Sequence, residues 1–408
     1  MSKAEPTTFL DRYSPPHIGT LVLLSGLSAL AMNIFLPSLP GMTAHFESDY
    51  RLVQLSVALY LAVNAVLQLM MGSVSDRLGR RPVILAGLAI FLVATLGCIW
   101  ASNIWVFLFF RMIQAAVVVG MVLGRAVVRD IVPEEQAASM IGYVTMGMAV
   151  VPMIGPAVGG LLDAAFGWQA SFWLLFAVGL LTFLLTWMDL GETAPLESRS
   201  FREQITEYPE LFASIRFWGY ASTAALSAGS FFSYLGGAPY VGDKVFGLSP
   251  AELGFLFGAP AIGYFTGNFL SGRLSIRVGV NRMVMIGSVV NAAGMAVNLA
   301  MFYAGIGTVY SFFGLITMVG LGNGMVIPNA TAGALSVRPK LAGTASGLAG
   351  ALMIGGGAAL SALAGALLGP ETGAFPLLWL MFLSASGGVV AIVLVIRRDR
   401  KLMSDITN

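Results

Sequence analysis

The chain has 408 residues, of which 57% are hydrophobic and only 10% are charged, with a formal net charge of +2 and a mean hydropathy of +0.84. Soluble globular proteins carry about 25% charged residues, so this composition excludes a soluble enzyme, a nucleic-acid-binding protein and a disordered scaffold as the class of the whole chain. At about 20 apolar residues per crossing, the length accommodates roughly a dozen transmembrane helices.

The amino-terminal segment, residues 1–17, is a polar leader that runs directly into a full-length apolar segment. Because no short apolar stretch with a small-residue cleavage site is present, we expect this apolar segment to be retained as a spanning helix and not removed as a signal peptide. The single cysteine, Cys98, lies in an apolar run and cannot form an intramolecular disulfide.

Apolar windows of about 20 residues, bounded by charges, Pro or Gly, predict twelve spans in two sets of six. The first set lies near residues 18–40, 51–72, 82–101, 104–126, 139–162 and 168–189, and the second near 215–238, 251–271, 282–304, 306–328, 342–368 and 374–396. The predicted organisation is a leader (1–17), a six-helix bundle (18–190), a cytoplasmic linker with an amphipathic helix (191–214), a second six-helix bundle (215–396) and a tail (397–408).

The basic residues predict which side of the membrane the termini occupy, because Lys and Arg in short loops resist translocation. Eighteen of the 22 Lys and Arg residues fall on the side of the two termini, whereas only Arg51 and Lys244 fall on the opposite side. The remaining two, Arg111 and Arg125, lie inside the fourth span. We therefore expect both termini to be cytoplasmic.

Between the second and third spans, residues 72–82 carry one acid, Asp76, among the basic residues Arg77, Arg80 and Arg81. Glycine and proline there allow a tight turn at the membrane surface, and Asp76 can pair with the flanking arginines or with a neighbouring helix end. A basic stop signal alone needs neither the acid nor the glycine spacing. The segment resembles the G-x-x-x-D-R-x-G-R-[RK] signature of the major facilitator superfamily and implies a gating role.

An internal repeat with an offset of 200 residues supports two halves. It aligns Gly72, Arg77, Gly79 and Gly87 with Gly272, Arg277, Gly279 and Gly287. The second copy of the signature keeps Arg277 but has Ile276 at the position of Asp76. We therefore predict an all-α membrane protein with two parallel six-helix pseudo-repeats, a design that places a substrate site between the repeats near the midplane.

The fourth span contains Arg111 within apolar sequence, followed by Gln114. Such an arginine is costly unless it faces other helices or water. The segment resembles the superfamily's R-x-x-Q/G motif, and both a structural anchor and a coupling element remain open as its role. The span ends on three more charged residues, Arg125, Arg129 and Asp130, of which the last two are candidates for the gate.

The fifth span contains two prolines and small residues at a spacing that permits close helix contact. Its residues Gly155, Pro156, Gly159 and Gly160 resemble the G-P-x-x-G-G motif typical of antiporting, exporting members of the superfamily. An ordinary close-packing helix is the alternative interpretation.

Three further segments, residues 32–40, 125–130 and 167–169, are similar to the bicyclomycin and chloramphenicol resistance (Bcr/CflA) exporters of the drug:proton antiporter branch. The resemblance extends over the whole chain. It implies a monomeric multidrug exporter of the bacterial inner membrane, with a small-molecule substrate, protons as the coupling ion, and no cofactor or nucleic-acid partner.

One departure from that family is the residue Asn33, where the family's first span usually carries an Asp. Asn can neither take up a proton nor pair with a cation. The predicted midplane contains no carboxylate at all, and both histidines, His17 and His45, lie outside it. A cationic substrate would therefore enter a low-dielectric cavity unpaired, at a high energetic cost.

Two hypotheses follow from this absence. Neutral or anionic substrates are favoured, particularly if Arg111 or Arg125 reaches the cavity. Proton coupling, if it occurs, must use carboxylates at a cytoplasmic gate, and Asp76 and Asp130 are the best candidates.

The remaining cavity candidates are uncharged. Tyr60, Asn64 and Gln68 recur at i, i+4 and i+8 on one face of the second span. The others are Asn33 in the first span, Asn323 in the tenth, and Phe231 and Tyr234, which lie near the kink-prone segment 236–239 of the seventh. A polar and aromatic lining suits moderately apolar compounds, but hydrogen bonding between helices is an alternative role for each amide.

Rival functions lack the residues that they require. No G-x-x-x-x-G-K-[ST] sequence is present for a nucleotide-driven pump, and no His, Cys and carboxylate cluster lies beside the spans to form a metal site or an enzyme active site. A channel is a weaker rival, because two repeats favour alternating access. The serious alternatives are export of a specific metabolite and uncoupled facilitation by the same fold.

Overall fold

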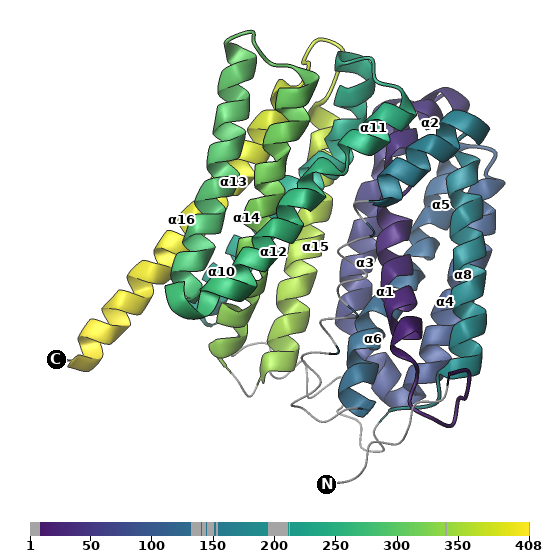
Figure 1. Cartoon of the computed structure of the whole chain (residues 1–408), viewed down its shortest axis with the longest axis horizontal. Coiled ribbons are helices and arrows are strands. Elements are labelled where there is room, and N and C mark those ends of the chain that lie inside the picture. The colour runs from purple at the N-terminus through teal and green to yellow at the C-terminus, as the bar shows by residue number, and fades with distance from the viewer. Residues whose placement is uncertain are drawn as a thin grey trace. The chain divides into compact units, whose positions relative to one another are not determined.

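The computed structural model describes residues 9–131, 140, 144, 151, 154–194, 211, 213–338 and 341–407, without the side chains of 342–344 and 401–407. All regular elements within these residues are helices, which confirms the predicted all-α class (Figure 1). The chain forms two compact units, Met1–Phe201 and Arg202–Asn408. Most of the predicted linker helix and residues 139, 141–143, 145–150, 152 and 153 of the fifth span lie outside the described residues.

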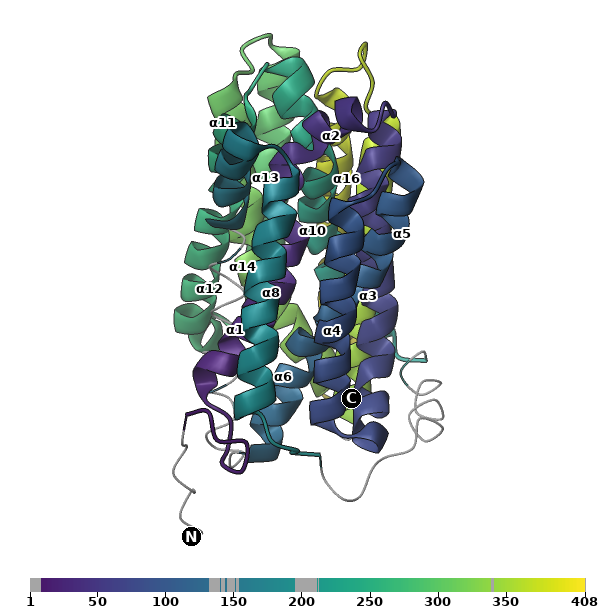
Figure 2. The same cartoon turned by 90° about the vertical axis from the view of Figure 1, so that its right-hand side faces the viewer.

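The first unit is built from long helices interrupted by short ones. Its elements are α1 (Ile18–Asn33), η1 (Leu36–Ser38), α2 (Leu39–His45), α3 (Tyr50–Leu78), α4 (Arg80–Ile99), α5 (Ile104–Gln114), η2 (Ala115–Val117), α6 (Val118–Ile131), a helix at Ile154–Phe166 and α8 (Gln169–Asp189). Within this unit α4 packs along both α5 and α8, as Figure 2 shows for α8.

The second unit has the same character. Its elements are α10 (Ile215–Tyr240), η3 (Val241–Val245), α11 (Pro250–Leu256), α12 (Ala259–Val278), α13 (Val280–Tyr303), α14 (Val309–Ser336), α15 (Ala342–Leu367) and α16 (Phe375–Thr407). Helix α14 packs against both α12 and α13, while α10 packs against α15 and α16. The last helix runs past residue 396, so the predicted tail continues α16 up to Thr407.

Ten helices of the described chain are long and apolar enough to cross a membrane. Two others occupy predicted spans five and seven. The helix at Ile154–Phe166 is apolar but shorter, and α10 is long but rich in serine, glycine and alanine. The exact number of twelve spans therefore stays a prediction.

Small residues set the distance between helices in the second unit. A Cβ atom built on Gly320 of α14 would lie 1.8 Å from the carbonyl oxygen of Pro260, and one built on Gly263 of α12 would lie 2.0 Å from that of Thr317. Any larger side chain at these two positions would push α12 and α14 apart. Backbone contact of this kind is the usual means of helix association inside a membrane, where no hydrophobic force drives one helix toward another.

The signature segment 72–82 differs from the predicted loop. Helix α3 continues to Leu78 and α4 begins at Arg80, so Gly79 alone connects them, with φ +94°. Gly279 connects α12 to α13 in the same way, with φ +88°. Glycine adopts this left-handed conformation without steric cost, which explains why the repeat keeps a glycine at both positions.

Candidate functional site

Arg111 of α5 is a completely buried cation in the first unit, with 0% of its surface exposed. Its guanidinium reaches three acceptors. Nη2 donates to the carbonyl oxygen of Ala31 at 2.8 Å, Nε donates to that of Ser56 at 3.3 Å, and Nη1 donates to Oε1 of Gln114. Helices α1, α3 and α5 thus meet at one side chain, and all three of these acceptors are neutral.

The contact with α1 has a physical reason. Pro37 and Pro40 have no backbone N–H to donate to the carbonyl four residues earlier in a helix, and α1 ends at Asn33. The carbonyl of Ala31 is one of the last four of α1, which lack partners within the helix, and the carboxyl end of a helix carries a partial negative charge. A buried guanidinium at this place satisfies the carbonyl and is itself stabilised by the helix dipole.

Two aromatic rings lie against the same guanidinium. The Arg111 Cζ atom lies 4.3 Å from the ring centre of Phe35 and 4.1 Å from that of Tyr60. Gln114, which accepts from Arg111, donates to Thr95 of α4 at 2.8 Å. The Tyr60 hydroxyl is buried and has no hydrogen-bond partner among the described residues. Ring faces and neutral oxygens therefore hold this charge, and the site offers one free phenolic hydroxyl.

A second cluster lies where α3, α4 and α6 end or begin, and Arg80 is its centre. The Arg80 Nη1 atom lies 2.5 Å from Oδ1 of Asp76, and its Nε lies 3.1 Å from Oδ2 of Asp130. The Arg80 side chain is 8% exposed, against 26% for Asp76 and 16% for Asp130. The two acids that the sequence singled out for a gate therefore share one arginine.

Glu192, which is not among the residues predicted from the sequence, completes this cluster. Its carboxylate accepts from the backbone N–H of Arg80 at 2.8 Å and of Arg81 at 3.3 Å, the first residues of α4. A carboxylate at the amino end of a helix satisfies free N–H groups and interacts favourably with the dipole. Glu192 lies 112 residues from Arg80 in the chain, so no local spacing in the sequence could indicate this pair.

The other predicted basic residues lie outside the ion-pair cluster around Arg80. Arg81 donates through Nε to the carbonyl of Leu190 at 2.8 Å and so binds α4 to the end of α8. Arg77 and Arg129 are exposed. Arg125 is partly buried on α6, and it makes no ion pair with any carboxylate that the structure describes.

The fifth-span motif makes close backbone contact with α1. A Cβ atom on Gly159 would lie 1.7 Å from the carbonyl oxygen of Ile34, and one on Gly155 would lie 3.4 Å from Leu30 Cδ1. Pro156 and Gly160 are buried beside them on the same helix. The geometry supports the close-packing role of the motif, and its link to the direction of transport stays a prediction.

The three amide candidates of the first unit form hydrogen bonds within their own helices. Asn33 is 1% exposed and donates to the carbonyl of Ala29 at 2.8 Å. Gln68 donates to Oδ1 of Asn64 at 2.8 Å, one turn away on α3. These contacts satisfy part of each amide without a ligand.

The candidates of the second unit are parts of its interior. Tyr234 is fully buried, with its ring 4.7 Å from that of Phe257 and 6.2 Å from that of Phe231. Asn323 of α14 accepts from Ser227 of α10 at 2.6 Å. The hydrogen bond between helices that was the alternative for Asn323 is therefore present.

Among the described residues no three or more His, Cys, Asp or Glu side chains gather closely enough to hold a metal ion.

Comparison with known proteins gives one family over almost the whole chain. Residues 21–249 and 224–407 match the profile of the family described as Major Facilitator Superfamily. The chain is 33% identical over 366 residues to "Multidrug resistance protein D" of Escherichia coli (strain K12), covering 86% of this chain and 89% of that protein. It is 31% identical over 345 residues to "Chloramphenicol resistance protein" of Pseudomonas aeruginosa, covering 82% and 80%.

A solved structure has the same fold. It is titled a bacterial homolog to human lysosomal transporter Spinster, in inward-facing and occupied conformation, and it aligns with a TM-score of 0.70. The alignment covers 95% of this chain and 97% of that one at 18% sequence identity, so the likeness concerns the fold alone.

Proposed function

The chain belongs to the major facilitator superfamily, and we propose that it is a secondary active exporter of small, moderately apolar, drug-like compounds that are neutral or anionic. The names of its relatives, which include multidrug and chloramphenicol resistance proteins, support drug export of the Bcr/CflA type. We propose that it works as a monomer in the bacterial inner membrane, with protons as the coupling ion.

The environment of Arg111 is the observation that supports a neutral or anionic substrate. This fully buried cation is held by neutral oxygens and two ring faces, with no carboxylate among its described contacts. The part of the first unit around Arg111 therefore carries a positive charge. A cationic compound entering this part would meet repulsion in a low dielectric, whereas an anion or a dipole would be attracted.

The membrane topology that we propose rests on the lengths and compositions of the described helices. We propose that α10 and the helix at Ile154–Phe166 add to the ten apolar helices to give twelve crossings, with the domain boundaries predicted from the sequence. The arginine-rich ends of the helices support cytoplasmic termini.

The gate that we propose is the cluster around Arg80. Alternating access requires contacts at one membrane face that form in one state and break in the other. Asp76 and Asp130 both pair with Arg80, so protonation of either acid would weaken the link between α3, α4 and α6. The cluster thus offers a place for the coupling proton that does not require a carboxylate in the cavity.

Two alternatives share this fold, namely export of a specific metabolite and uncoupled facilitation. Flux through the purified protein in proteoliposomes, measured with and without a pH gradient, separates proton-coupled export from facilitation. Coupled export predicts accumulation of a neutral phenicol-type compound against its gradient only when ΔpH is imposed. Equal flux with and without the gradient would refute proton coupling and leave facilitation.

A further inference from the structure

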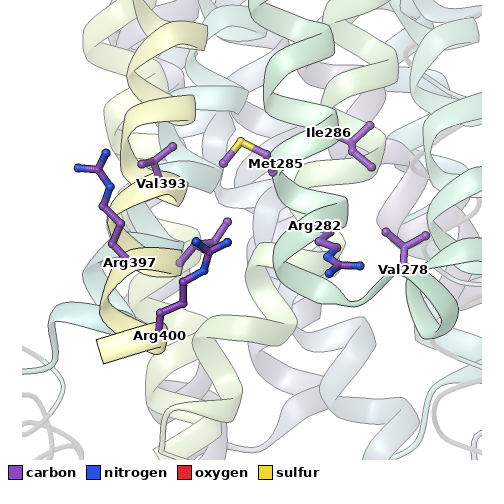
Figure 3. Close-up of a pocket in the computed structure, with 8 residues that line it drawn as sticks. Val278, Arg282, Met285, Ile286, Val393, Arg397 and Arg400 are labelled. Carbon is purple, nitrogen blue, oxygen red and sulfur yellow. The ribbon is translucent and has the colours of Figure 1, made fainter. Parts of the chain in front are cut away.

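A surface pocket of about 480 Å³ lies between α13 and α16 in the second unit, far in sequence from the gate cluster (Figure 3). Its walls are apolar. Met285 and Ile286 of α13 line one side, and Val393 and Ile396 of α16 line the other. Ile286 is 45% exposed, so these walls open outward from the helix pair.

Three arginines surround the same pocket. Arg282 lies in the first turn of α13, and Arg397 and Arg400 lie one turn apart on α16. Figure 3 shows the two α16 arginines on one side of the pocket and Arg282 on the other. All three are exposed, and none forms an ion pair with a carboxylate in the part of the chain whose side chains are described.

The nearest acid on α16 is already neutralised. Oδ1 of Asp399 lies 2.7 Å from Nε of Arg216, and its Oδ2 accepts from Asn281 at 2.9 Å. Asp399 therefore binds the end of α16 to α10 and α13, and its charge is not available to the pocket. Three like charges beside one apolar hollow repel each other, and an anion placed among them would relieve that repulsion.

We propose that this pocket binds an anionic phospholipid of the cytoplasmic leaflet. Arginine matches phosphate oxygens with paired N–H donors, and the five apolar side chains that line the pocket, Val278 with the four named above, provide a surface for the first part of an acyl chain. Basic pockets between transmembrane helices on the cytoplasmic side are a known means of recognising such headgroups. The apolar walls favour a lipid over free phosphate, which would leave them unused.

The proposed site is separate from the transport proposal, because its lining comes from α13, α16 and the last residue of α12 and includes no residue of the gate cluster. A bound lipid would join the start of α13 to the cytoplasmic end of α16, and would therefore stabilise the second unit.

The test uses the purified full chain, stripped of lipid in a neutral detergent, and counts bound lipid by native mass spectrometry. Phosphatidylglycerol and phosphatidylcholine with the same acyl chains are titrated in parallel. At about 1 kcal/mol for each basic residue near an anionic surface, removal of each arginine should weaken binding about fivefold. The variant Arg282→Gln/Arg397→Gln should therefore bind phosphatidylglycerol roughly 25- to 30-fold more weakly than the unchanged chain, with phosphatidylcholine unaffected.

A matched control removes the same charge elsewhere. Arg273 of α12 and Arg398 of α16 are exposed and do not line the pocket, so Arg273→Gln/Arg398→Gln should retain the preference for phosphatidylglycerol. The variant Met285→Trp keeps all arginines but fills the pocket, and it should lose the preference too. Met285→Trp also gives a result if the double glutamine variant does not fold.

Three results would overturn the proposal. The first is equal binding of the two lipids by the unchanged chain. The second is an equal loss in the pocket variant and its matched control. The third is a shift of the thermal unfolding midpoint by inorganic phosphate as large as that by phosphatidylglycerol, which would identify a free anion as the ligand.

Discussion

Replacement of Arg111 by Lys is the most informative perturbation of the first unit. Lys keeps the positive charge but offers one nitrogen, whereas Arg111 uses three nitrogens on three acceptors from α1, α3 and α5. If lysine holds one acceptor and loses two, the free energy of unfolding should fall by about 3 to 6 kcal/mol, at roughly 1.5–3 kcal/mol for each hydrogen bond to a charged group.

Arg111→Ala should be worse for function, since it also removes the ring contacts with Phe35 and Tyr60 and the cation at the end of α1. We expect Ala to abolish drug flux and Lys to leave a small fraction of it. Flexible lysine does not reproduce a planar fork with five donors, so retention of charge alone should not rescue the site.

The assay combines chemical unfolding in detergent micelles with flux in proteoliposomes. Arg51→Lys, an exposed position at the start of α3, is the matched control and should unfold within about 0.5 kcal/mol of the unchanged chain. An Arg111→Lys protein that matched this control in stability and in flux would refute the reasoning, because the fork geometry would then have no effect.

Three further predictions concern the gate, the helix contact and the cavity. Asp76→Asn should abolish flux while membrane insertion, followed by immunoblot of the membrane fraction, stays normal; unchanged flux would remove this acid from the mechanism. Gly159→Ala should reduce the monodisperse yield in size-exclusion chromatography, because its Cβ would lie 1.7 Å from the carbonyl oxygen of Ile34. The control Gly155→Ala, whose Cβ would lie 3.4 Å from a side-chain atom, should be tolerated. Similar yields for the two variants would contradict the packing argument. Asn33→Asp should widen tolerance toward cations and make transport more pH-dependent in a competition series of neutral, anionic and cationic compounds, and identical profiles for both proteins would show that this position is not in the cavity.

The predicted spans agree closely with most of the helices, and the reason is that hydropathy is a local property. A window of about 20 apolar residues has few alternatives to a membrane helix, because every backbone group must be satisfied within the segment. Where the pattern was weaker, the prediction was less accurate. The charged segment 72–82 predicts a loop, yet α3 and α4 leave only Gly79 between them, because charged residues at the membrane surface remain compatible with a helix.

For the candidate site, too, the sequence predicts individual residues but not their contacts. Arg111 stood out from its sequence because a charge in an apolar run is expensive, but its partners on α1 and α3 lie 80 and 55 residues away. The amides Asn64 and Gln68 were identified as polar residues on one face, and the structure shows that they bond to each other.

The class of the protein, the positions of most helices and the charged motifs can be predicted from the sequence, since composition and periodicity act over one helix at a time. Which polar groups meet depends on the packing of the helices. Arg80 contacts Asp130 across 50 residues and Glu192 across 112, and Arg397 and Arg400 of α16 face the same pocket as Arg282 of α13. Such pairs depend on how helices pack, which is set by small residues and backbone contacts between distant segments, and no local pattern records that arrangement.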